Sequence, residues 1–288
     1  MGHLQLICLA NSWKHGHRCI AGVSGAAQTW VRPMGLNEHG SVPTSTELIY
    51  GTHRSTLRDL KLLDIVELPL EPVGPAEFDF ECENRTVLPG PWQVVGRAQI
   101  DDIVPLLQPH GPILHNSDRY VTVSELHGRP FEQRKTLQLV YTDFLHVTHR
   151  KKRNGDYQWK ATLKTRGGYG LTNAAITDPH LVALLRRNIY PKRPCLVTVS
   201  LSMPYGHKHT PADSCWKLVA GVIELSLADQ ILVELHLAGW TIGQGQRYAM
   251  ATYGKMQRSQ LTDSEKICFI EYLKHQVQPR SNSSFAVV

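Results

Sequence analysis

Short apolar segments of strand length, each ended by a polar or glycine- and proline-rich turn, fill most of this sequence and constrain its fold more than any other feature. In the first half they occupy residues 4–10, 18–25, 29–35, 60–70 and 86–100, followed by a short helical segment at 101–111. In the second half they occupy residues 137–150, 157–168, 169 onward, 194–206 and 215–225. A short helix capped by Asp178 and Pro179 precedes the last pair of these strands.

This pattern of about five strands occurs twice and predicts two small barrels. Five strands with a helix before the last pair are typical of the OB type of Greek-key barrel. The predicted fold is therefore mainly β, with two tandem OB-like Greek-key barrels. Two sandwich-like domains would fit the same pattern.

The residues after the second set of strands have a helical pattern. Residues 239–255 and 259–277 are predicted to form two helices, and Thr262 with Glu265 forms a capping box at the start of the second. The predicted domains are a first barrel at 1–132, a second barrel at 133–235, a small α-helical C-terminal module at 236–278 and a flexible tail at 279–288.

Composition narrows the class of protein. The chain has 288 residues, more than one average domain, and no apolar stretch approaches the roughly 20 residues of a membrane helix. The first residues lack the pattern of a secretory signal, so we expect a cytoplasmic protein. Six cysteines without a CxxC pair indicate free thiols rather than disulfides. A net charge of +6 favours a polyanionic partner.

Segment 8–23 contains the first candidate site. Its thiols could serve as metal ligands or as a nucleophile. Cys8, His15, His17 and Cys19 are competent zinc ligands, although their spacing matches no common structural zinc pattern. The two histidines are also possible bases for a nucleophilic cysteine, but no later segment supplies a partner motif. Both cysteines lie in apolar strands, where a thiol behaves as a small hydrophobic group.

A third reading of the same segment is electrostatic. Lys14, His15, His17 and Arg18 together with Trp13 form a cationic turn with an aromatic side chain at its tip. Such a turn suits contacts to a phosphate backbone with a base stacked on the ring, and a plain solvated turn is the alternative. We interpret the segment as a cationic turn whose thiols point inward.

A second basic turn follows residue 148. Tyr157, Trp159 and Lys160 lie on the strand that returns from it, and a solvated turn with Trp159 in the core is the alternative. In an OB barrel the hairpin loops and the sheet flank the groove that takes single strands. The basic residues of this turn predicted to bind nucleic acid are Arg150, Lys151, Lys152 and Arg153.

Three further groups of residues are weaker candidates. Lys164 and Arg166 lie beside glycines that permit close approach of a phosphate, or that simply form a flexible turn. Lys255 and Arg258 in the terminal helices are candidates for contacts to nucleic acid or to protein. A possible metal cluster, which surface loops often mimic, comprises His207, His209, Asp213 and Cys215.

Several segments, in order, resemble the prokaryotic dual OB-containing domain family. They are CLANSWKHGHRCIAGV, TWVRPMG, LLDIVELPL, ENR before PWQVVG, ITDP, and VTVSLSMPYG before CWKLVAGVI, spanning about residues 4–226. The resemblance implies two tandem OB barrels and a nucleic-acid-related role, with no established catalytic residues. It places Ser12, Lys14, Arg18 and Arg32 at the ligand-facing edge of the first barrel and Asp178 at that of the second. Residues 239–274 are similar to short helical tails of recombination and single-strand-binding proteins.

These observations predict a non-catalytic protein that binds single-stranded DNA or RNA through charge contacts and base stacking, without a cofactor or metal. One alternative is an interaction subunit of a prokaryotic nucleic-acid-processing or defence complex. Another is a metal-dependent enzyme that uses the His and Cys clusters. The sequence does not distinguish DNA from RNA, because the contacts to the 2′-hydroxyl leave no pattern in it.

Overall fold

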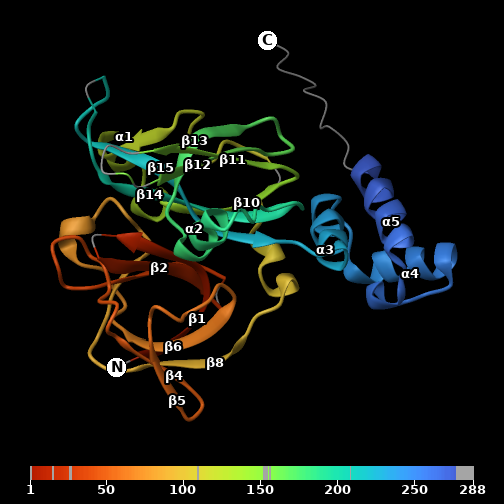
Figure 1. Cartoon of the computed structure of the whole chain (residues 1–288), viewed down its shortest axis with the longest axis horizontal. Helices are drawn as coiled ribbons and strands as arrows, with labels where there is room; N and C mark the ends of the chain where they lie inside the picture. Colours follow the sequence, from red (N-terminus) through yellow and green to blue (C-terminus); the bar gives the residue numbers. More distant parts are fainter. Residues whose placement is uncertain are drawn as a thin grey trace. The chain divides into compact units, whose positions relative to one another are not determined.

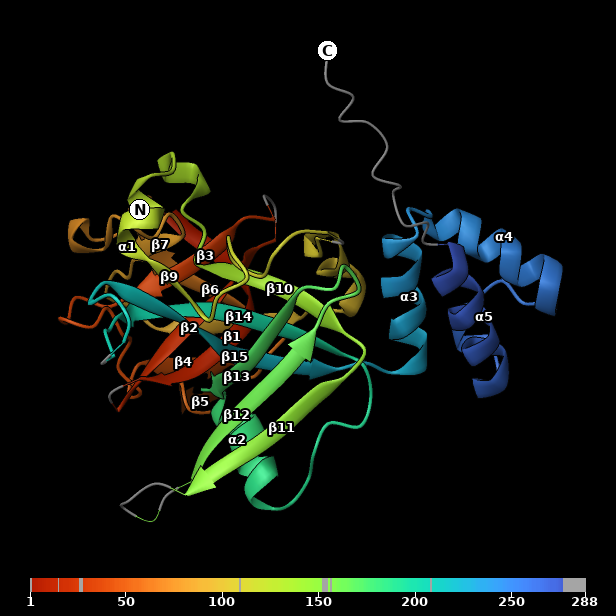
Figure 2. The ribbon, with the colours of Figure 1, turned by 90° about the horizontal axis from the view of Figure 1, so that it is seen from above.

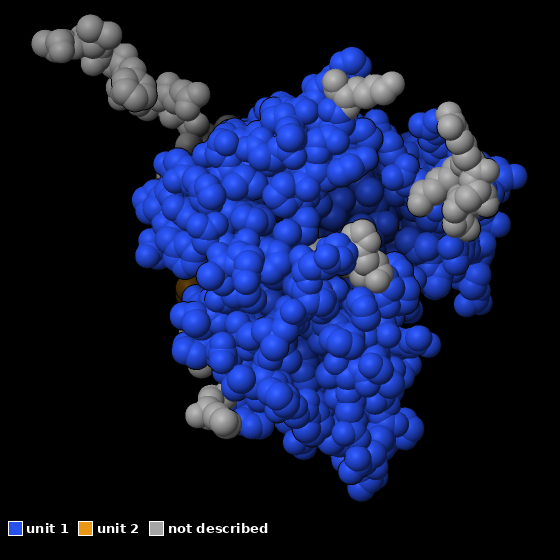
Figure 3. Space-filling model, turned by 90° about the vertical axis from the view of Figure 1, so that its left-hand side faces the viewer, with its two compact units in different colours: residues 1–102, 106–224 blue, residues 103–105, 225–288 orange. Residues whose placement is uncertain are grey.

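The computed structural model describes residues 2–14, 16–25, 28–108, 110–151, 155, 157–207 and 209–276. It divides the chain into two compact units (Figure 3). The first unit comprises residues 1–102 and 106–224 and contains both sheets. The second, which we call the helical unit, comprises residues 103–105 and 225–288.

The first barrel is built on a long N-terminal strand (Figure 1). Strand β1 pairs with β6 through its first half and with β2 through its second half, so that it belongs to both sides of the barrel. Strands β3 and β7 pair in parallel, and a bridge from Leu70 to Val87 joins β6 to the segment after β7. The strands of this barrel are β1 (Gly2–Lys14), β2 (His17–Ser24), β3 (Trp30–Met34), β4 (Glu47–Tyr50), β5 (His53–Thr56), β6 (Asp64–Leu70), β7 (Asn84–Thr86) and β8 (Trp92–Arg97).

The second barrel is formed by the other sheet. Its strand order is β10-β14-β15-β13-β12-β11, with β13 and β15 parallel, and Figure 2 shows β11 and β12 as a long hairpin. Helix α2 lies between β13 and β14 in the chain, as predicted, and Asp178 caps it. The elements are β9 (Tyr120–Thr122), α1 (Val123–His127), β10 (Leu137–Thr142), β11 (Leu145–Lys151), β12 (Tyr157–Lys164), β13 (Gly170–Ile176), α2 (Pro179–Arg186), β14 (Cys195–Pro204) and β15 (Ser214–Glu224).

The first barrel differs from the predicted pattern in two respects. Between β3 and β6 it carries the β4–β5 hairpin where the second barrel carries helix α2 between β13 and β14. The helical segment expected at 101–111 is reduced to two short 3₁₀ turns, Ile100–Asp102 and Val104–Leu106.

Each barrel has an apolar core, that of the second barrel also taking in Met34, Phe78 and Phe80, and a cluster of three alanines and a leucine lies between the barrels. Leu6, Leu68 and Trp92 are fully buried in the first core, and Val197 and Val219 are in the second. Between the barrels a small cluster joins β1 and β2 to β15 and β10, and its buried members are Ala10, Ala21, Leu137 and Ala220. The small side chains let β1 and β15 approach closely.

Up to residue 276 the helical unit contains three α-helices, α3 (Leu227–Leu237), α4 (Ile242–Tyr253) and α5 (Asp263–Gln276), and the 3₁₀ turn Arg258–Gln260. Its apolar core includes Phe269 and Leu273. The predicted capping box of α5 is present, because Thr262 N donates to Glu265 and Glu265 N donates back to Thr262 Oγ1. Helix α3 is not among the helices that the sequence pattern predicts, and the helical unit begins at 225 rather than at 236. The Ser226–Asp229 capping box marks that start.

Candidate functional site

Two predicted residues of the first barrel lie where the barrels meet. Ser12 is buried, and its hydroxyl lies 3.1 Å from Thr177 Oγ1 and donates to the carbonyl of Ala220 at 3.3 Å. Trp13 is 48% exposed at the end of β1. Lys14 follows in the same strand, but its side chain lies outside the described residues, as does all of His15. Ser12 therefore has a structural role between the barrels.

Arg18 is buried at the start of β2. Only 6% of the residue is exposed, and its guanidinium carbon lies 5.1 Å from the centre of the Trp13 ring. Backbone hydrogen bonds to and from Val42 fix its position. Burial and the positive charge of Arg58 hold the pKa of Arg18 below its ordinary value, against the opposing effect of Asp178.

Arg32 does not lie at a ligand-facing edge. It is 3% exposed, pairs with Glu81, and donates to Thr136 at 2.9 Å and to Ser200 at 3.3 Å. Burial lowers the pKa of Arg32 most strongly of any single cause, but the nearby Glu81 and Glu83 carboxylates, the Cys19 thiol and the hydrogen bond to Glu81 together outweigh it and raise the pKa. We therefore correct its assignment: Arg32 ties β3 of the first barrel to the second barrel and is not accessible to a ligand.

The basic hairpin forms as predicted, with Arg150 opposite Gln158 and Lys151 opposite Tyr157. Lys152 and Arg153 lie outside the described residues. Trp159 is 5% exposed and belongs to the core of the second barrel, so the alternative that placed it in the core is the one the structure shows. Tyr157 is 46% exposed but packs beside Trp159, with ring centres 6.2 Å apart. Neither ring shares a face with Lys160.

Three of the predicted cations do share one face of the second barrel. Along β12, Gln158, Lys160, Thr162 and Lys164 alternate with buried residues and so point outward. Arg150 pairs with Gln158 across the hairpin and is on the same side. Within the described part of the chain no carboxylate pairs with Arg150, Lys160 or Lys164, which we call the cationic row.

The remaining two cations of this region are differently placed. Lys151 is exposed at the end of β11, beside the turn. Arg166 lies 3.5 Å from an oxygen of Asp143 and 5.3 Å from the ring centre of Tyr141, so its charge is already engaged.

A group of rings that sequence reasoning missed lies on β15 and its neighbours. The indole of Trp216 lies 5.4 Å from Tyr120 and 5.6 Å from His207, and His207 lies 5.0 Å from Tyr205. Arg119 stacks over Trp216 at 5.5 Å. Tyr205 is 59% exposed. These five residues, the ring cluster, combine exposed aromatic surface with a positive charge.

The cationic row and the ring cluster lie on the same face of the second barrel. Lys160 pairs with Ala175 of β13, and Ala175 pairs with Leu218 of β15, so the three share a face. Trp216 is two residues from Leu218 and points the same way. Arg119 also donates to the carbonyl of Asn173 on β13 at 3.1 Å, which bridges the two groups.

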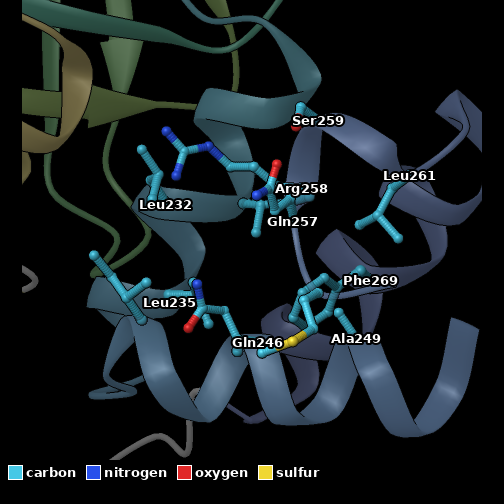
Figure 4. A pocket seen from close by; sticks show the side chains of 13 residues that line it. Leu232, Leu235, Gln246, Ala249, Gln257, Arg258, Ser259, Leu261 and Phe269 are labelled. Carbon is cyan, nitrogen blue, oxygen red and sulfur yellow. The ribbon is translucent and has the colours of Figure 1, made fainter. Parts of the chain in front are cut away.

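The two predicted cations of the helical unit do not form a common site. Lys255 makes two contacts with the carboxylate of Glu265, at 2.9 and 2.6 Å. Arg258 lines a pocket of about 360 Å³ together with Leu232, Leu235 and Phe269 (Figure 4). In that view the Arg258 side chain extends toward Leu232 on α3.

The metal and thiol alternatives gain no geometric support. Among the described residues, which do not include His15, no three His, Cys, Asp or Glu side chains are placed to hold a metal ion. Asp213 accepts hydrogen bonds from Ser124, which lower its pKa, and Cys215 is buried. Burial and the charge of Asp64 raise the pKa of the Cys8 thiol, the opposite of what a nucleophile needs.

Comparison with known families agrees with the two-barrel architecture. A family model described as a dual OB-containing domain matches residues 4–222. The chain belongs to this dual OB-containing domain family. Membership indicates a binding role of the OB type for the two barrels. The matched region ends within β15, so helices α3, α4 and α5 lie outside it.

Other comparisons add little to the dual OB-containing assignment. A protein of Synechocystis sp. (strain ATCC 27184 / PCC 6803 / Kazusa), described as uncharacterized, is 39% identical over 64 residues. The match covers 22% of this chain and 22% of that protein, so the chain spans well under two thirds of its length. No solved structure gives a significant match. None of the described helices is both long enough and apolar enough to cross a membrane.

Proposed function

We propose that this dual OB protein is a non-catalytic binder of single-stranded nucleic acid and that the strand lies on the outward face of the second barrel. The observation that carries this proposal is that the cationic row and the ring cluster share that face. In OB folds the face of strands two and three, with the loops beside it, binds oligonucleotides. Strands β12 and β13 are the equivalent strands here, and Tyr205 and His207 lie in the β14–β15 loop.

The chemistry of this face suits a single strand. Lys160, Lys164 and Arg150 have no carboxylate partners among the described residues, so they are available to phosphates. Trp216 and Tyr205 offer ring faces on which unpaired bases stack, each stack contributing about 1–3 kcal/mol. Bases within a duplex present only their edges, so this face favours a single strand over a duplex.

The test is fluorescence anisotropy of the full chain with a labelled single strand and the matching duplex at two salt concentrations. Four contacts, from Arg119 and the cationic row, predict a slope of log affinity against log salt of about −3. Trp216→Ala should weaken binding by about tenfold or more, whereas Trp216→Phe, which keeps a ring, should retain most of it.

The matched control for charge is on helix α2. Lys160→Glu should weaken binding strongly, while Arg186→Glu makes the same change of charge at an exposed position away from this face. Equal losses in both variants, a duplex preference, or affinity independent of salt would overturn the proposal.

A further inference from the structure

A second cationic feature lies between the two barrels, in a pocket of about 890 Å³. Its walls come from the segment 50–63 and β2 of the first barrel and from the start of helix α2 and the end of β15. Four cationic side chains line it: Arg18, Arg58, Lys61 and Arg97. Its volume falls within the range of pockets that hold small ligands.

Arg18 is the residue that points to a ligand. It is more than nine-tenths buried, and its Nε and Nη1 atoms are buried without a hydrogen-bond partner among the described residues. Burying a charged guanidinium with two unpaired nitrogens is costly, and because Arg18 lines the pocket, an anion there would offset part of the cost of burying its charge. Stacking on Trp13 and the two backbone bonds to Val42 hold Arg18 in place without a ligand.

The carboxylates of the pocket are occupied within the protein. Asp178 Oδ1 accepts from the backbone N–H groups of His180 and Leu181, at 2.8 and 3.1 Å, and so caps helix α2. Asp59 accepts from the hydroxyl of Ser55. Asp64, behind the pocket, accepts from Arg97 at 3.0 Å. Asp178 and Asp59 lie near enough to Arg18 to favour its charged form, but among the described residues neither forms an ion pair or hydrogen bond with Arg18 or Arg58. The two guanidinium groups are therefore not neutralised by a direct carboxylate contact.

We propose that this inter-barrel pocket binds a phosphate monoester, the group found at the end of a nucleic-acid strand or on a mononucleotide, with Arg18 and Arg58 as its principal contacts. The inference deepens the proposed function and rests on it for the nature of the ligand. Strand β13 connects the two sites, since Asn173 and Asp178 are five residues apart, roughly 16 Å along extended backbone.

A terminal phosphate fits this pocket better than an internal phosphodiester. The monoester carries about −1.5 to −2 charges at pH 7 and presents three strong acceptor oxygens, whereas a diester carries one charge. Arginine binds such oxygens with paired hydrogen bonds. A pocket of small-ligand size also receives the end of a chain more readily than its middle, since the chain has to leave in only one direction.

The experiment compares four ligands on the full chain: one single-stranded oligonucleotide with a 5′-phosphate, the same oligonucleotide with a 5′-hydroxyl, AMP, and adenosine. Direct titration calorimetry gives each affinity. We expect the phosphate to strengthen binding by about tenfold to a hundredfold, for the oligonucleotide or for AMP over adenosine. The arm in which the gain appears identifies the source of the phosphate.

Substitutions identify the side chains that bind the phosphate. Arg58→Gln, at an exposed position, should bring the ratio of phosphate to hydroxyl affinity close to one, and Arg18→Gln should do the same. Arg54→Gln is the matched control, because Arg54 is exposed on the neighbouring strand β5 and does not line the pocket. The Arg54→Gln variant should keep the wild-type ratio of phosphate to hydroxyl affinity.

The outcomes separate the two proposals. If the hydroxyl-ended strand binds as well as its phosphorylated form and AMP binds no better than adenosine, the pocket is overturned and the proposed function stands. AMP binding that depends on Arg58, with no binding of the hydroxyl-ended strand, supports the pocket and overturns the proposed function. Absence of binding by all four ligands overturns both.

Discussion

At the scale of single residues, the buried charges of this protein hold the barrels together. Arg32 of β3 reaches Glu81, Thr136 and Ser200, while Glu83 accepts from the backbone N–H of Thr136 at 2.7 Å. Burial raises the pKa of Glu83, against the opposing charge of Arg32. Removing one member of such a group leaves the others buried without compensation.

Replacing Arg32 should therefore be strongly destabilising. We expect Arg32→Met to lower the free energy of unfolding by about 3–5 kcal/mol, because Glu81 and Glu83 would remain buried without their cation. Urea denaturation measures the change. Arg54→Met, which breaks the exposed pair with Glu47, should cost at most about 1 kcal/mol. Similar losses in the two variants would contradict this account.

Lys217 predicts a pH dependence. It is 3% exposed, its Nζ donates to Asn116 at 2.7 and 2.9 Å, and burial lowers its pKa from 10.5 to about 8. Between pH 8 and 10.5 the unfolded chain therefore binds more protons than the folded one, and stability from this group rises with pH. Relative to Lys217→Met, the wild-type protein should gain about 1–2 kcal/mol across this range.

The measurement is the urea midpoint of both proteins at pH 7.5 and pH 10. Other groups titrate in this range, but their effect is common to both proteins and cancels in the difference. If the urea midpoints of the two proteins change equally with pH, Lys217 keeps its ordinary pKa in the folded state.

At the scale of elements, local patterning predicted the strands well and the composition of the site only in part. The alternation of residues 157–164 fixes β12 and its hairpin partner, as the structure shows. Because successive residues of a strand point to opposite faces, Trp159 and Lys160 cannot line the same groove. Lys160 and Lys164 share the outward face, and the sequence contains that information.

Close approach of β1 and β15 gives an element-scale prediction. A Cβ atom on Gly221 would lie 2.3 Å from the carbonyl oxygen of Leu9 in the other barrel. Gly221→Ala should therefore destabilise the protein by about 2 kcal/mol or more, as measured by thermal or urea unfolding. At Gly96 the nearest atom to an added Cβ is Ile65 Cδ1 at 3.5 Å, an ordinary contact. Gly96→Ala should change stability little, and a larger loss there would refute the packing argument.

At the scale of the whole molecule, the features that sequence reasoning missed all depend on contacts between distant segments. Arg119 and Trp216 are far apart in the chain, and β9 pairs with β15 only in the folded barrel. Arg58 joins Arg18 in one pocket because the loop before β6 folds back toward β2. The prediction that Arg32 lies at a ligand-facing edge is wrong because the sequence of a short strand does not indicate that buried carboxylates surround its arginine.

The contacts between the barrels predict that they unfold together. Ser12 with Thr177, Arg32 with Ser200 and the small-residue cluster with Ala220 each join residues of both barrels, so neither barrel loses these partners alone. Hydrogen exchange followed by mass spectrometry tests this. Arg32→Met should reduce protection of β6 and of β12 by the same free energy, although only one of them belongs to the barrel that carries the substitution. Peptides from α5, whose unit has its own core, provide the internal reference. Loss of protection confined to β6 would show that the barrels are independent domains and that the inter-barrel network is only a contact between them.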